Sequence, residues 1–397
     1  MSQPAFFLMH NPLQHYDWGS RDSLSRLFSL PNPSGEPQAE LWMGAHPNGC
    51  SQLVTPEGEV RLDTWIAAAP ARALGADTAA RYGRLPYLFK VLAAEKALSV
   101  QVHPSKAQAE AGFARDNAAG LAATAPNRNY RDDNHKPELV FALTPYQAMN
   151  AFRPIPEIQA LFARVAIPQL TPLTAALAAQ PDEAGLAAFF RALLTLSGDT
   201  KTRALQALLD AAQRWQDEET FAVISSLAQQ YPGDVGLFAP LLLHVLTLQP
   251  GEAMYLDACT PHAYIRGTGL EIMASSDNVL RAGLTPKHID VDELLHCTLC
   301  RGRDASSLKL TPQRDGKICH YPVPVPDFTF SVYPAGAHAL ASQGAEILFA
   351  IDGPLTLSDN ADQSLTLQPG QSAFIPASTR HYQVSAMGRF ARAGNQP

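Results

Sequence analysis

Four side chains of this sequence carry the donor atoms that a metal site needs. Gln101 and His103 lie on the polar face of an alternating run, residues 98–104, which has two valines on its other face. Glu138 and His262 each stand at the start of a run typical of a β-strand. Two imidazoles, a carboxylate and an amide oxygen bind a divalent transition metal and leave coordination positions for substrate oxygens. Each residue alone is a weak indication, but together they predict a catalytic metal centre.

Residues 262–287 concentrate further reactive side chains among glycines. The segment contains one phenol, two carboxylates and three cationic groups, which belong to Tyr264, Glu271, Asp277, Arg266, Arg281 and Lys287. A period of two places His262, Tyr264 and Arg266 on one face of a first strand. A second short strand, Leu270–Ala274, is expected after the glycine-rich break. This density of reactive groups indicates a functional site.

Cationic side chains also occur in unusual surroundings. Lys90 stands within the apolar run 85–93, where an ammonium group is unfavourable unless it reaches water or meets an anion. Lys136 shares one side of an emerging strand with Glu138 and follows His135. A surface Lys–Glu pair contributes little to stability, whereas a lysine beside a metal-binding carboxylate acts in catalysis. Both interpretations remain open at the level of sequence.

The whole chain sets limits on function. Its 397 residues suffice for two or three domains, and its net charge of −7, without a basic block, argues against nucleic acid as a partner. No run approaches the ~18 apolar residues of a membrane span, and no secretion signal is recognisable. The odd count of five cysteines suits a reducing compartment, and the isolated pair Cys297 and Cys300 is interpreted as structural. We expect a cytoplasmic protein without a membrane partner.

The elements that must position these residues form distinct regions. Residues 154–235 are rich in alanine and leucine at helical spacing and predict a helical insertion. Leu-Thr-Leu-Gln-Pro-Gly occurs at 246–251 and again at 365–370, each time followed by a run that leads to a histidine, His262 or His381. A strand, a Pro-Gly turn and another strand make the hairpin of a double-stranded β-helix barrel. The fold is therefore predicted to be mainly β, with two such barrels and one helical domain.

The motifs at 130–138 and 262–287 resemble the two signature regions of the type I mannose-6-phosphate isomerases (phosphomannose isomerases) of the cupin superfamily, and the similarity extends to segments 16–19 and 39–47. The resemblance implies a catalytic cupin domain at 1–153 and 236–305, interrupted by the helical domain at 154–235. It also implies a cupin-like C-terminal domain at 306–397 without a metal site. The members interconvert mannose 6-phosphate and fructose 6-phosphate through a cis-enediol.

By this resemblance, one zinc ion per chain is bound by Gln101, His103, Glu138 and His262. The expected catalytic residues are Arg281, Lys136, Glu271 and Asp277. The expected substrate-binding residues are Lys90, Ser99, His135, Tyr264, Lys287 and Trp18. The substrate is a small sugar phosphate, and a monomer is expected. Proton transfer between carbons needs a base, but the sequence does not choose among Glu271, Asp277, Lys136, Lys90 and His135.

Two other functions share part of this pattern. Two histidines and a carboxylate also describe a non-haem iron oxygenase of the cupin type, although such an enzyme has no need for the cationic rim formed by Lys90, Lys136, Arg281 and Lys287. A cupin that binds a sugar phosphate without turnover needs the metal and the cationic rim but no base. Isomerisation therefore remains the preferred prediction.

Overall fold

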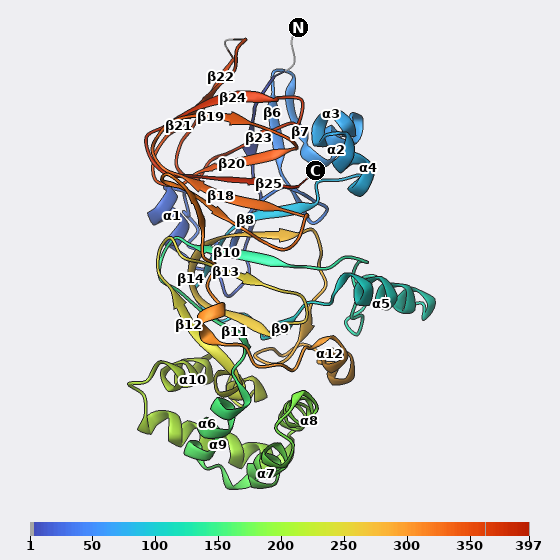
Figure 1. Ribbon diagram of the computed structural model, residues 1–397, viewed down its shortest axis with the longest axis vertical. Helices are drawn as coiled ribbons and strands as arrows, with labels where there is room; N and C mark the ends of the chain where they lie inside the picture. The colour runs from blue at the N-terminus through green and yellow to red at the C-terminus, as the bar shows by residue number, and fades with distance from the viewer. Residues whose placement is uncertain (1–3, 362, 397) are drawn as a thin grey trace.

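The computed structural model describes residues 4–361 and 363–396. The molecule is elongated, with one β-barrel at one end, a second barrel in the middle and a group of helices at the other end (Figure 1). The protein is thus mainly β with a helical insertion, as the hydrophobic periodicity predicts. No helix among the described residues is long and apolar enough to cross a membrane.

The middle barrel, called the central barrel below, carries the predicted metal ligands. All of its strand pairs are antiparallel, and the path β12-β11-β14-β8-β3-β2 is extended by β9, β10, β13 and β15. Its strands are β2 (Leu13–Gln14), β3 (Glu40–Met43), β8 (Tyr87–Ala94), β9 (Gln101–Val102), β10 (Glu138–Ala142), β11 (Tyr146–Phe152), β12 (Leu243–Leu248), β13 (Ala253–Leu256), β14 (His262–Ala274) and β15 (Leu280–Arg281).

The strand β14 organises the central barrel. Its first half pairs with β9 and β11, and its second half pairs with β8 and β10. The register with β11 shifts at Ile265, since Ala148 lies opposite Tyr264 while Gln147 lies opposite Arg266. This β-bulge changes which side chains of β14 face the interior.

The glycine-rich segment does not end the strand, so the prediction of two separate strands is wrong. Gly267 has a φ of 127°, and a Cβ atom there would lie 2.5 Å from the carbonyl oxygen of Pro145. Glycine alone tolerates both conditions, so the strand continues through the bulge. Arg266, predicted to share a face with Tyr264, is exposed and lies 3.8 Å from Glu95, because the bulge turns it outward.

The barrel at the far end, called the C-terminal barrel, combines strands from both ends of the chain. The order β16-β17-β18-β25-β20-β23-β1-β6-β7 places β1 between β23 and β6. These strands are β16 (Gln313–Asp315), β17 (Ile318–Tyr321), β18 (Thr329–Tyr333), β25 (Phe390–Gly394), β20 (Glu346–Ala350), β23 (Ser372–Ile375), β1 (Phe7–His10), β6 (Gln52–Thr55) and β7 (Gly58–Arg61). The opposing sheet contains β19 (Gly336–Ala341), β24 (His381–Ala386), β21 (Leu355–Ser358) and β22 (Ser364–Leu367). A separate two-stranded sheet pairs β4 (Ala45–His46) with β5 (Gly49–Cys50).

The sequence repeat forms the same hairpin in both barrels. Strand β12 leads through Pro250-Gly251 into β13, and β22 leads through Pro369-Gly370 into β23. Both glycines have positive φ values, 93° at Gly251 and 86° at Gly370. Strands β14 and β24 then begin at His262 and His381, as the repeat predicts.

Helices cover the far side of the central barrel and flank both barrels (Figure 1). In α9, Leu205, Leu208 and Ala212 form a buried stripe, and α5 begins with a capping box between Ser105 and Gln108. The helices are α1 (Ser23–Phe28), α2 (Leu62–Ala68), α3 (Pro70–Leu74), α4 (Ala76–Tyr82), α5 (Lys106–Ala118), α6 (Ile155–Val165), α7 (Thr171–Ala179), α8 (Glu183–Leu194), α9 (Gly198–Arg214), α10 (Glu219–Gln230), α11 (Ala239–Leu242) and α12 (Val291–Cys297). Short 3₁₀ turns span Pro168–Leu170, Val235–Phe238 and Ala305–Ser307.

Candidate metal centre and active site

The predicted ligands His103, Glu138 and His262 meet inside the central barrel. His262 begins β14, Glu138 begins β10, and His103 follows β9 directly. One potential ligand atom from each residue lies within 4.8 Å of the others. Nε2 of His103 is 3.4 Å from Oε1 of Glu138, and Nε2 of His262 is 3.3 Å from Oε2. All three side chains are buried.

Both imidazoles are oriented for metal binding. Nδ1 of His103 lies 2.7 Å from the carbonyl oxygen of Asn278, and Nδ1 of His262 lies 2.9 Å from that of Thr260. A carbonyl only accepts, so each Nδ1 carries the proton and each Nε2 presents a lone pair. Both Nε2 atoms are buried without a hydrogen-bond partner. Buried orphan acceptors beside a carboxylate fit a divalent metal such as zinc.

Gln101 lies beside this cluster. It faces His262 directly across the pair β9–β14, so both side chains lie on the same side of the sheet. The residue is buried at 8% exposure, and its side chain makes no hydrogen bond within the described part of the chain. An amide oxygen in this place is available as an additional ligand.

A row of buried charged and polar groups continues from the ligands into the barrel. The hydroxyl of Tyr264 lies 3.2 Å from Oε2 of Glu138 and 2.6 Å from Oε1 of Glu271. Oε2 of Glu271 lies 3.1 Å from Nζ of Lys90, which is 3.6 Å from Glu40. The bulge in β14 makes this row possible, because Tyr264 and Glu271 would otherwise face opposite sides of the strand.

The charges in this row determine each protonation state. Burial alone would lower the pKa of Lys90, but Glu40 and Glu271 raise it above its usual value. Burial raises the pKa of Glu271 despite the opposing effect of Lys90. Burial would also raise the pKa of Glu138, but Lys136 and His103 hold it well below its usual value. The ammonium group of Lys90 is therefore charged beside carboxylates.

Lys136 and Asp277 flank the cluster on its more open side. Nζ of Lys136 lies 3.2 Å from Oε1 of Glu138, with 12% of the side chain exposed. Asp277 is 42% exposed and lies 3.1 Å from Nε2 of His46. Partial burial raises the pKa of Asp277, but the hydrogen bond from His46 and the charge of Lys136 outweigh it, so the pKa is lowered. Unlike Glu271, Asp277 is an ionised carboxylate that a ligand can reach.

Asn278 is a structural residue that sequence reasoning missed. Its backbone carbonyl accepts from His103, while its side-chain amide donates to the carbonyls of Asp132 and Asn134 at 2.8 Å each. Its Oδ1 accepts the backbone N–H of Arg131 at 2.7 Å. Asn278 thereby joins the loop that carries Lys136 to a metal ligand. In the sequence this residue ends a short run of small polar residues, 275–278, which is typical of a turn and gives no indication of such distant partners.

Arg281 borders a small polar cavity next to the metal site. Its backbone pairs with Gln101. Its guanidinium has no hydrogen bond or ion pair within the described residues, which argues against a simple surface salt bridge. Burial, followed by the charge of Arg131, lowers its pKa. Lys287 is exposed, and Arg281 is the largest cause of its lowered pKa.

Three other predicted residues lie around the site with different surroundings. His135 contacts Asp327 at 3.0 Å and lines a separate cavity of about 580 Å³, so it points away from the ligand cluster. Trp18 is half-buried and stacks on Tyr16, with ring centroids 5.7 Å apart. Ser99 is partly exposed, two residues before Gln101. The structure brings the predicted ligands together but not His135.

One residue of the C-terminal barrel, Glu346, occupies a position that corresponds to the candidate ligand Glu138 in the central barrel. Glu346 begins β20 opposite Ile375, just as Glu138 begins β10 opposite Leu256 in the matched hairpin. Arg392 binds both oxygens of Glu346, at 2.5 and 3.0 Å. The guanidinium therefore neutralises the carboxylate that corresponds to Glu138.

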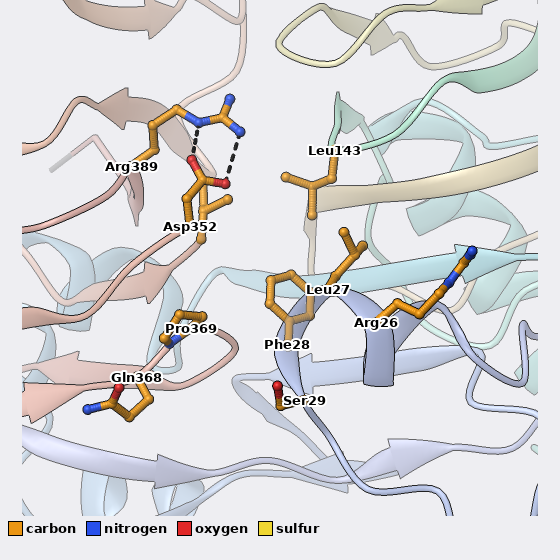
Figure 2. A pocket seen from close by; sticks show the side chains of 10 residues that line it. Arg26, Leu27, Phe28, Ser29, Leu143, Asp352, Gln368, Pro369 and Arg389 are labelled. Carbon is orange, nitrogen blue, oxygen red and sulfur yellow. Dashed lines mark hydrogen bonds and ion pairs between the residues drawn. The ribbon is translucent and has the colours of Figure 1, made fainter.

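A further cavity, of about 490 Å³, lies between α1 and loops of the C-terminal barrel. Figure 2 shows Phe28 and Leu27 on one side of it and the ion pair of Asp352 with Arg389 on the other. Its charged side chains are already paired, since Arg26 lies 3.3 Å from Asp22. The cavity offers no arrangement for catalysis comparable to that of the ligand cluster.

Fold and site together define a metal-binding protein of the cupin class. Its central barrel carries the candidate metal ligands, and its C-terminal barrel has a structural role. Models of the type I phosphomannose isomerase catalytic domain, the type I phosphomannose isomerase helical insertion domain and the mannose-6-phosphate isomerase cupin domain match residues 6–155, 168–243 and 317–395. The mannose-6-phosphate isomerase of Escherichia coli K12 is 47% identical, over 97% of this chain and 98% of its own. The chain belongs to the type I phosphomannose isomerase family, which confirms the resemblance seen in its motifs.

Solved structures agree with this assignment. A zinc-bound mannose 6-phosphate isomerase superposes with a TM-score of 0.95 at 44% identity, covering 99% of this chain and all of the other. A mutant of phosphomannose isomerase from Salmonella typhimurium gives a TM-score of 0.96 at the same identity and coverage. The predicted fold, a mainly β protein with a helical insertion and a cupin domain, is thereby confirmed.

Proposed function

We propose that this protein is a zinc-dependent isomerase that interconverts mannose 6-phosphate and fructose 6-phosphate through a cis-enediol. The observation that carries the proposal is the pair of buried, unpartnered Nε2 atoms beside Glu138, in a chain whose relatives bear the name of this activity. We assign one zinc ion to Gln101, His103, Glu138 and His262. Bound zinc supplies Lewis-acid stabilisation of charge on the substrate oxygens.

The chain's own residues supply the proton chemistry. Asp277 is the preferred base, because its pKa is lowered and its side chain is 42% exposed, whereas Glu271 is buried and its pKa is raised. Asp277 removes the proton from C2 of the aldose and returns it to C1. Lys136, next to the ligand Glu138, donates to the substrate oxygen that gains a proton. Glu271 positions Tyr264 by accepting a hydrogen bond from its hydroxyl, and Lys90 in turn holds Glu271.

Arg281 is assigned to stabilising the negative charge that develops on O1 and O2. Its backbone pairs with Gln101 across β15–β9, its guanidinium has no partner among the described residues, and two parallel N–H groups suit adjacent oxygens. Ser99, Lys287 and Trp18 remain proposed contacts for the rest of the substrate. His135 is better explained as a structural partner of Asp327.

The proposed division of the chain follows the same logic. Residues 1–153 and 236–305 form the catalytic cupin domain, 154–235 the helical insertion and 306–397 the C-terminal cupin-like domain, with β1, β6 and β7 pairing onto the last of these. A monomer is proposed because one chain supplies every ligand. Cytoplasmic location is proposed because all five cysteines are free.

Incubation with mannose 6-phosphate in deuterated water tests the proposed function. An isomerase forms fructose 6-phosphate and incorporates solvent deuterium at carbon. A metal oxygenase would instead consume dioxygen, and a sugar-phosphate-binding cupin would bind without turnover. Either of these results would refute the proposal.

A further inference from the structure

The polar cavity beside Arg281 is a compact compartment lined by three arginines and two aspartates. It measures about 70 Å³, roughly the share of two water molecules in the liquid. A sugar ring does not fit this space, but a single tetrahedral anion does. The charged side chains that line it are Arg128, Arg131, Asp277, Arg281, His288 and Asp290.

The acidic groups of the cavity are already engaged elsewhere. Asp290 caps α12 through the backbone N–H of Glu293 at 3.0 Å and accepts from Asn129 at 2.8 Å. Asp277 accepts from His46 and Asn48. Among the described residues, neither carboxylate forms an ion pair with an arginine of the cavity. The positive charge of the cavity is therefore not neutralised by direct pairing.

The arginines differ in how far their donors are used. Arg128 is buried and donates to three acceptors, so its role is structural. The guanidinium of Arg281 has no partner among the described residues, and the guanidinium of Arg131 donates only to the carbonyl of Ala123 at 2.5 Å. The charge of Arg131 contributes to the lowered pKa of both Arg281 and Lys287. Two under-used guanidinium groups and one lysine are thus held close together, an arrangement that an anion would stabilise.

We infer that Arg131 is a specificity-determining residue that binds the phosphate group of the substrate in this cavity. The inference rests on the proposed function, which supplies a phosphorylated sugar. Arg281 forms the wall between the phosphate and the metal site, and Lys287 adds charge at the exposed edge. Arg131 lines the cavity from the loop before β10. It lies within the motif at 130–138, but the sequence analysis predicts no role for it.

Asn278 fixes the distance between the two ends of the substrate. Its Oδ1 holds the backbone N–H of Arg131, and its carbonyl holds the imidazole of His103. The phosphate-binding arginine and a metal ligand are thereby attached to one buried residue. A sugar phosphate of the right length spans the two, whereas a sugar without the phosphate loses one anchor.

The test compares Arg131→Gln with Arg131→Lys and the wild type. We expect Arg131→Gln to raise KM for mannose 6-phosphate and Ki for inorganic phosphate by roughly 10- to 100-fold, the scale of one charged hydrogen bond. The kcat should stay within about twofold, and zinc content should not change. Arg131→Lys should recover part of the affinity. Arg266→Gln is the matched control, because it removes an exposed arginine that pairs with Glu95.

Two measurements separate failure of this inference from failure of the proposed function. If the wild type isomerises the substrate but Ki for inorganic phosphate is the same in Arg131→Gln, Arg131 only holds Ala123 and the inference is wrong. If the wild type does not isomerise but calorimetry shows phosphate binding that Arg131→Gln loses, the proposed function fails while the phosphate site stands. A raised KM with an unchanged phosphate Ki also overturns the inference.

Discussion

Replacing Asn278 with alanine should weaken both the fold around the active site and the hold on zinc. The residue is fully buried, and its side chain forms short hydrogen bonds to the carbonyls of Asp132 and Asn134 and to the N–H of Arg131. Alanine leaves these three backbone groups without their partner. Each buried unsatisfied group costs about 1–3 kcal/mol, and water entering the vacated space recovers part of that. We expect a loss of about 2–5 kcal/mol in the free energy of unfolding.

The effect on zinc is separate, because the carbonyl that orients His103 belongs to the backbone and survives the substitution. Its position, however, is held by the lost side-chain bonds. Losing such outer support typically lowers metal affinity by about 10- to 100-fold. Urea denaturation in the presence of a chelator measures stability without metal, and competition with a chromogenic chelator measures zinc affinity.

Asn32 provides a matched control for this experiment. Its amide also donates to two backbone carbonyls, of Arg21 and Glu36, at 2.8 Å each, but the residue is only partly buried and these bonds are exposed to solvent. Asn32→Ala should lower stability by less than about 1 kcal/mol, because water replaces its bonds. If Asn278→Ala behaves like this control in both assays, the role assigned to Asn278 is refuted.

Four further outcomes are expected. His262→Ala should lose bound zinc and turnover together, as metal analysis and kinetics would show; full metal content would contradict the ligand assignment. Arg281→Ala should lower kcat and kcat/KM together by about 10²-fold, and a raised KM with normal kcat would leave it only a binding role. Alanine at exposed charges within residues 154–230 should change the rate no more than a few-fold; a large loss of kcat at normal stability would implicate the helices. Burial raises the pKa of Cys297 to about 11 and of Cys300 to about 12, so both thiols should resist iodoacetamide at pH 8 until the protein unfolds, and rapid labelling of the native protein would disprove their burial.

The sequence was most informative where local pattern and chemistry coincide. The repeated Pro-Gly hairpin predicted both barrels, and the helical spacing predicted α6–α10, because both depend on neighbours along the chain. His103, Glu138 and His262 were recognisable because their residue types are unusual on strand faces. These three came together as expected.

Features that depend on contacts between distant segments could not be read in this way. The bulge at Ile265 arises from pairing with β11, so strict alternation misplaced Arg266. The roles of Asn278 and Arg131 depend on contacts between the loop before β10 and the segment that leads into β15, and the sequence does not show these contacts. His135 follows Asn134 in a dense motif, yet its partner Asp327 lies far along the chain. A motif therefore predicted a shared location but not the direction of each side chain.

The place of β1 between β23 and β6 sets the order in which this protein can be completed during synthesis. The side chains of Asn11 and Ser372 are hydrogen-bonded across 361 positions of the chain. At about 5–20 residues per second, a ribosome needs roughly 20–70 s to make the intervening segment. Throughout that interval Phe7 and Met9, buried in the finished protein, lack β23, the partner of β1 on one side.

Nascent chains that end before β20 should therefore expose an unpaired edge and remain sensitive to protease. Protection should appear only after β23 has left the ribosomal tunnel, which limited proteolysis of stalled chains would reveal. Protection of shorter chains would show that β1 finds another cover first. The C-terminal barrel is thus completed only once β23 is available to pair with β1.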